Sequence, residues 1–247
     1  MMKLYGSLIY RELRLTGRRF VWMLAAFVLL VLLMLIPLFL GGFSGVSGAD
    51  DDTQSVIFLF TATVALTGGL MAGTNNGLQR ADISAGWKRY AFVLPPSAGQ
   101  QALSDLLVKL SCILLFGLLT VIYTLAFDVL TGSKMILHAL NVYLGTVSAA
   151  MLVDTAYSYI VMLARDKKQL RILGIAAFFA AGLVLRVFGL FGRLPDREGE
   201  VIPEIVFDKL LGTLAFRKTT LWVLAAFVVV CALFLLTMWR SHKRREP

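Results

Sequence analysis

Long apolar runs separated by short polar segments dominate the pattern of this chain. A helix needs about 20 predominantly apolar residues to cross roughly 30 Å of hydrocarbon. Several runs reach this length, so the pattern predicts an all-α polytopic membrane protein with a single transmembrane domain over residues 1–247. We expect its transmembrane helices at residues 20–41, 55–79, 105–131, 137–163, 172–192 and 219–240.

The segment before the first apolar run has a different pattern. Its polar residues recur at steps of three or four, which places them on one stripe of a helix. They are Lys3, Ser7, Arg11, Arg14 and Arg18. We therefore predict an amphipathic helix over residues 3–19 that lies in the membrane interface with its cations facing the headgroups. The alternative is a solvated helix that binds a partner.

The polar loop at residues 80–104 has internal order. Its apolar residues fit one face of a short helix. They are Ile83, Trp87, Tyr90, Ala91 and Leu94. Pro95 and Pro96 must end this helix, because a residue before proline avoids the α conformation. Ser97 followed by Gln100 is a capping-box pattern, which predicts that a new helix begins near Ala98 and continues into the third span.

Small and amide residues mark the second span. Gly69, Gly73 and Gly77 recur at intervals of four. This spacing lets two helix backbones approach closely, so it predicts a helix–helix contact within the chain or between two copies. Asn75 and Asn76 lie near the inner end of the span, where they face the headgroups or line a pathway.

Three charged residues fall within the predicted spans, namely Asp128, Asp154 and Arg186. Charges inside a membrane are costly and therefore point to function. Asp128 lies close to the outer end of its span, whereas Asp154 lies about 15 Å of helix from the inner end. Two interpretations stay open. Arg186 pairs with a carboxylate and fixes packing, or Asp154 lines a path for a substrate or a proton.

The balance of charge predicts the topology. The chain has a net charge of +9, although only 16% of its residues are charged. Lys and Arg cluster at the N-terminus, at 80–104, at 165–171 and at 240–247, as the positive-inside bias would produce. We therefore expect a plasma-membrane protein with both termini cytoplasmic and no binding of nucleic acid. The segment 193–218 does not fit this pattern, because it carries five Lys and Arg residues on the predicted outer side.

The sequence contains no clear catalytic or cofactor-binding motif. The chain has no G-x-x-x-x-G-K-[ST] phosphate loop, so we expect neither a nucleotide site nor a cofactor in it. Cys112 and Cys231 lie far apart in apolar runs without metal-ligand spacing. Neither His138 nor His242 forms a Ser–His arrangement that would make a nucleophile. We therefore expect no metal site and no enzymatic activity in this chain.

The loop and the start of the third span together resemble a known family. Asp82, Gly86, Tyr90, Leu94-Pro95, Ser97 and Lys109 resemble the acidic-xxx-Gly-xxx-Tyr-xxx-Leu-Pro-x-Ser…Lys segment of ABC-2-type transporter permeases. The predicted layout of an amphipathic N-terminal helix, six spans and a polar loop between spans two and three is similar too. The motif covers about thirty residues, and the layout covers the whole chain.

The resemblance implies a function. In that family the loop between spans two and three is a coupling helix that docks on a separate ATP-binding subunit, which holds the ATP and Mg. It would assign coupling to the ATPase to Asp82, Gly86, Trp87, Tyr90, Leu94, Pro95 and Ser97. The working unit would also contain a second permease copy or a paralogue, as a homodimer or heterodimer.

The same resemblance leads us to expect an exporter subunit. Apolar helices with few intramembrane charges suit an amphipathic cargo, such as a peptide, a lipid or a hydrophobic drug. Two alternatives remain open. One is an ion-coupled secondary transporter that uses Asp154 and Arg186. The other is a membrane partner protein that transports nothing.

Overall fold

The computed structural model describes residues 2–39, 51–74, 97–163 and 217–243. Within these ranges the elements are α1 (Met2–Phe39), α2 (Asp51–Gly73), α5 (Ala98–Thr131), α6 (Ile136–Leu163) and α9 (Arg217–Lys243). The described part of the chain is therefore all-α, as the sequence predicts.

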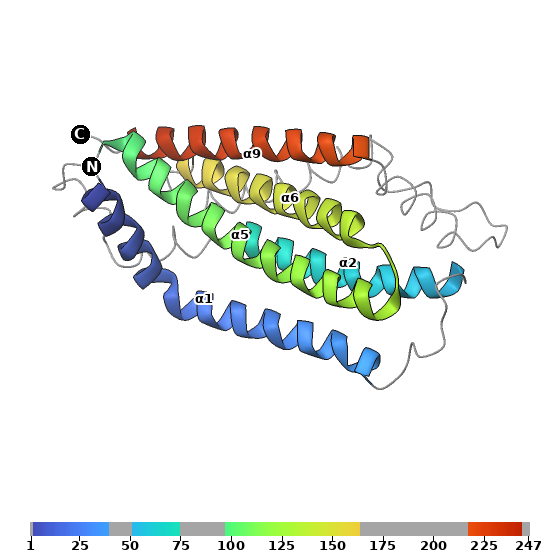
Figure 1. The fold of residues 1–247 in the computed structure, drawn as a ribbon. Coiled ribbons are helices and arrows are strands. Elements are labelled where there is room, and N and C mark those ends of the chain that lie inside the picture. Colours follow the sequence, from blue (N-terminus) through green and yellow to red (C-terminus); the bar gives the residue numbers. More distant parts are fainter. Residues whose placement is uncertain (1, 40–50, 75–96, 164–216, 244–247) are drawn as a thin grey trace, which may run out of the picture.

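The helices form one elongated bundle (Figure 1). α5 contacts each of the other four described helices, whereas α1 contacts α5 and α2. The first residues of α1, the start of α5 and the end of α9 lie at the same end of the bundle. α5 is thus the element through which the bundle is connected.

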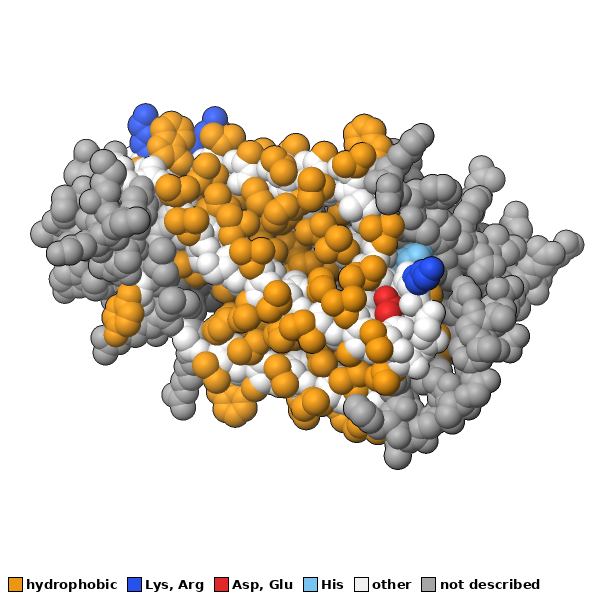
Figure 2. All heavy atoms as spheres, in the orientation of Figure 1, with side chains coloured by type: hydrophobic (Ala, Val, Ile, Leu, Met, Phe, Trp, Pro, Cys, Tyr) orange, Lys and Arg blue, Asp and Glu red, His pale blue; other side chains and the backbone are white. Residues whose placement is uncertain are grey.

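Four helices are long and apolar enough to cross a membrane, and they contain the segments Val56–Gly73, Ala98–Thr131, Ile136–Ile160 and Thr219–Ser241. α1 contains a shorter apolar segment, Phe20–Ile36. Hydrophobic side chains cover the middle of the face shown in Figure 2, and charged side chains lie toward its two ends. Such an extended apolar surface is rare on a soluble monomer, so the structure agrees with a membrane protein. The predicted span at 172–192 lies outside the described residues.

α1 differs from the prediction at its boundary. The sequence predicts an interfacial helix at 3–19 and a separate span at 20–41, but Met2–Phe39 is one continuous helix. Figure 1 shows its first part inclined to the remainder. The change from polar to apolar residues near Arg19 does not break the backbone, because a change in amphipathicity interrupts no i→i−4 hydrogen bond. A helix can therefore continue through a change in its surroundings.

α5 begins where its cap predicts. Ser97 Oγ accepts a hydrogen bond from the Gln100 N–H at 3.4 Å, and Gln100 Oε1 accepts one from the Ser97 N–H at 3.0 Å. This reciprocal pair is the predicted capping box, and the helix starts at Ala98. At the other end Gly132 adopts φ +71°, a left-handed conformation that glycine accepts without strain. α5 is therefore longer than the predicted span at 105–131.

The close contact between α2 and α6 depends on two glycines, which have no side chain. A Cβ atom at Gly69 would lie 2.8 Å from Thr146 Cβ and 3.0 Å from the Tyr143 carbonyl oxygen, and one at Gly73 would lie 2.4 Å from Ala150 Cβ. Glycine at these positions lets the two backbones approach closely. The close contact made by Gly69 and Gly73 is thus within the chain, while Gly77 lies outside the described residues.

Gly69→Ala should lower the free energy of unfolding by about 1–3 kcal/mol, because the new methyl group would clash with a side chain and a backbone carbonyl of α6. Gly145→Ala is the matched control, since a Cβ there meets nothing within 4 Å. It should be neutral or stabilising by up to about 1 kcal/mol, because alanine has the higher helix propensity. Reversible unfolding from mild into denaturing detergent measures both changes. Equal stability of the two variants would contradict the close contact.

Candidate functional site

A buried ion pair joins α5 to α6. The ammonium of Lys109 donates a hydrogen bond to Asp154 Oδ2. The two side chains are only 2% and 5% exposed. Both belong to helices with transmembrane length and composition, so the pair lies where neither charge is hydrated by bulk water.

α9 contributes a third contact to this site. The ring of Phe234 lies 4.7 Å from the Lys109 ammonium nitrogen, measured to the ring centroid, which is a cation–π distance. Phe234 itself is buried in the core of the bundle. Lys109 therefore contacts α6 through charge and α9 through an aromatic face, so three helices meet at one side chain.

The tryptophans of α9 indicate the depth of the pair. Trp222 and Trp239 are both exposed and are separated by about 26 Å of helix, close to the thickness of the hydrocarbon layer. Tryptophan is enriched at both membrane interfaces. Phe234 precedes Trp239 by about 8 Å of helix. Along α9 the ion pair therefore lies between the levels of the two tryptophans, nearer to Trp239.

A second contact supports this assignment of the interface. The ammonium of Lys243 lies 5.2 Å from the centroid of the Trp239 ring. An exposed lysine beside a tryptophan is typical of the headgroup region, where the ring is partly apolar and the cation stays hydrated.

The energetics of such a pair are asymmetric. Removing two charges from water costs several kcal/mol each, and their attraction offsets this cost only while both partners are present. Deleting one partner leaves an uncompensated charge in the apolar layer. Replacing both with apolar residues of similar volume is often neutral. The pair is therefore a strong constraint on helix arrangement but a weak source of net stability.

Asp128 has a different role from Asp154. Its Oδ1 accepts hydrogen bonds from Ser133 Oγ at 2.7 Å and from the Met135 N–H at 3.0 Å. The carboxylate thus connects the last turn of α5 to the start of α6. This arrangement agrees with the predicted place of Asp128 at the end of its span and accounts for its charge without a pathway.

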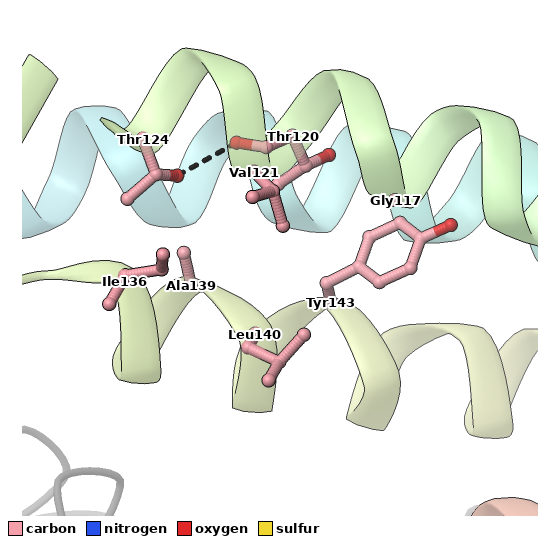
Figure 3. Close-up of a pocket in the computed structure, with 8 residues that line it drawn as sticks. All are labelled: Gly117, Thr120, Val121, Thr124, Ile136, Ala139, Leu140 and Tyr143. Atoms are coloured by element: carbon pink, nitrogen blue, oxygen red, sulfur yellow. Dashed lines mark hydrogen bonds between the residues drawn. The ribbon is translucent and has the colours of Figure 1, made fainter. Parts of the chain in front are cut away.

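A small cavity lies between α5 and α6 (Figure 3). Its volume is about 10 Å³, which is near the minimum for one water molecule. The Thr124 hydroxyl donates to the Thr120 carbonyl at 2.9 Å, and the Tyr143 hydroxyl donates to the Ile113 carbonyl at 2.5 Å. These lining groups are therefore satisfied within the protein, so the cavity offers no site for a polar ligand. It is lined by Gly117, Thr120, Val121, Thr124, Ile136, Ala139, Leu140 and Tyr143.

The remaining predicted site residues divide into two groups. Ser97 caps α5, and Asp154 pairs with Lys109. The others lie outside the described residues. They are Asn75, Asn76, Asp82, Gly86, Trp87, Tyr90, Leu94, Pro95 and Arg186. Within the described ranges, no three His, Cys, Asp or Glu side chains come together as a possible metal site.

Lys109 is the residue of this candidate site that the sequence did not single out as an intramembrane charge. It is part of the motif that resembles ABC-2-type permeases, and it lies within the predicted span at 105–131. The available signal was simple, because Lys109 is the only Lys or Arg of α5. A lone cation in one span and a lone carboxylate in the next are candidates for pairing.

Comparison with known proteins adds no assignment. No protein-family model, curated protein or solved structure matches the chain. The resemblance to ABC-2-type permeases therefore rests on the loop motif and the predicted layout.

Removing one member of the ion pair should destabilise the bundle strongly. Lys109→Met and Asp154→Leu should each lower the free energy of unfolding by about 3–5 kcal/mol, whereas the double variant should regain most of the loss. Unfolding in mixed detergent measures all three. Lys134→Met, at an exposed lysine in the turn before α6, is the control and should change little. Single-variant losses that simply add in the double variant would show that the two residues are not coupled.

Proposed function

We propose that this chain is the membrane-spanning permease subunit of an ATP-driven exporter of the ABC-2 type. It would work with a separate ATPase subunit, which holds ATP and Mg, and with a second permease copy or a paralogue. Its cargo would be amphipathic, such as a peptide, a lipid or a hydrophobic drug. This chain has no phosphate loop of its own, so the driving force has to come from the partner.

The observation that carries the proposal is the position of α5. The capping box at Ser97 starts this helix directly after the predicted coupling element, and α5 contacts every other described helix. A force applied to residues 82–94 would enter a rigid helix and reach the whole bundle. Rigid-body movement of packed helices is an established way to alternate access to a membrane pathway.

The arrangement of the helix ends also supports the proposed topology. The start of α1, the start of α5 and the end of α9 lie together (Figure 1). In the sequence, a basic cluster adjoins each of these three helix ends. We propose that this end is cytoplasmic. Six spans would then include the apolar part of α1 and the segment 172–192.

One observation favours a second candidate function. The buried Lys109–Asp154 pair is the kind of intramembrane charge pair found on ion and proton paths. An ion-coupled transporter would use Asp154 as the group that gains and loses a proton.

Affinity capture from the native membrane distinguishes the two candidates. The tagged wild-type chain should recover ATP-hydrolysing activity, because the loop docks on the ATPase. Scrambling residues 82–94 should abolish this recovery. A scramble of residues 42–50, in the loop predicted for the opposite side and before the start of α2, should leave it unchanged.

Failure to recover ATPase activity with the wild-type chain in gentle detergent would contradict the exporter proposal. Transport that depends on a proton gradient and is lost in Asp154→Asn would then favour the ion-coupled candidate.

A further inference from the structure

Two thiols lie beside the Lys109 site. Cys112 follows Lys109 by one turn of α5, and Cys231 precedes Phe234 by one turn of α9. Residues three apart lie on the same helix face. Cys112 therefore lies on the same face of α5 as Lys109, and Cys231 lies on the same face of α9 as Phe234. They are the only cysteines in the chain, and neither forms a disulfide.

The site lies at the end of a continuous mechanical connection. α5 runs without interruption from its cap at Ser97 to Lys109, over about 18 Å. Along this stretch it lies against α9, because a Cβ at Gly99 would be 4.0 Å from Trp239 and Lys109 contacts Phe234. Movement at the start of α5 would therefore be passed along this stretch to the contacts that Lys109 makes.

The contacts that Lys109 makes are of a kind that can open and close between two conformational states. Apolar packing of similar volume would hold the helices at least as well as a buried ion pair, so stability alone does not account for the charges. A hydrogen-bonded ion pair has a narrow range of geometry. A small displacement of α5 would therefore break the hydrogen bond between Lys109 and Asp154.

We propose that Lys109 is the positioning residue that transmits movement of the coupling loop to α6 and α9, and that its pair with Asp154 opens in the nucleotide-trapped state. This inference rests on the proposed exporter function. Opening separates α5 from α9 and admits water to Cys112 and Cys231. In the closed state both thiols lie about 12 Å of helix inside the level of Trp239, within the apolar layer.

Labelling of the native cysteines tests the proposal. The full-length chain and its ATPase are treated in inside-out membrane vesicles with a charged, water-soluble maleimide. Maleimides react with the thiolate, which forms in water and not in hydrocarbon. The labelling rate is measured without nucleotide, with ATP, and with ATP plus vanadate to trap the ATPase. Cys112→Ser and Cys231→Ser assign the label to each position.

The wild-type rate should rise by about tenfold on trapping, as expected when an open state shifts from roughly a tenth of the population to most of it. The double variant Lys109→Met with Asp154→Leu should still bind the ATPase subunit, but its labelling rate should no longer depend on nucleotide. Asp154→Glu keeps the charge and should retain the dependence. A purely structural pair would leave the nucleotide dependence of the apolar double variant unchanged.

The outcomes separate the two proposals. If the wild-type complex keeps its ATPase but is labelled at the same rate in every nucleotide state, the proposed opening of the pair is wrong. The exporter proposal is then unaffected. Nucleotide-dependent labelling that persists in the apolar double variant would overturn the role of Lys109. Absence of ATPase activity in the captured wild-type complex would overturn the exporter proposal, and this inference with it.

Discussion

The absence of water in the apolar layer is the constraint on which this structure depends. A polar group there either finds a partner within the protein or stays unpaired at a cost in free energy. Hydroxyl groups find a partner locally, since several Thr and Ser side chains donate to the carbonyl four residues earlier, as Thr120 does to Phe116 at 2.9 Å. Lys109 and Asp154 cannot find one locally, because each needs an opposite charge. Their pairing fixes how α5 faces α6.

Packing of α2 against α6 supports this orientation. Gly69 and Gly73 bring the backbone of α2 close to α6, whose other contacts are with α5 and α9. Phe27 of α1 and Phe116 of α5 pack edge to face, with ring centroids 5.2 Å apart. α6 is therefore held by close backbone contact with α2 at Thr146 and Ala150, and its carboxylate at Asp154 meets Lys109 one turn farther along. Small residues and charged residues fix the same helix in different ways.

Features that depend on a few neighbouring residues could be predicted from the sequence. The capping box at Ser97 and Gln100 is one, because its hydrogen bonds need only four consecutive residues. Whether α1 is continuous across residue 20 could not be predicted, because a change from polar to apolar residues is a change of environment and does not interrupt the backbone. The contact of Lys109 with Asp154 and Phe234 could not be derived, since it depends on which faces of three distant helices meet. The residues with predicted coupling roles, Ser97 apart, lie outside the described part of the chain.

The depth of the ion pair makes separation of its charges physically reasonable. At the centre of a bilayer a released ammonium would stay in hydrocarbon, and the cost would prevent opening. Lys109 instead lies at the level of Phe234, about 8 Å of helix from the interfacial Trp239. A lysine near a helix end can extend its apolar stem and place its charge among the headgroups. A pair at this level can therefore be buried when the helices are closed and hydrated when they part, which a pair at the bilayer midplane could not be.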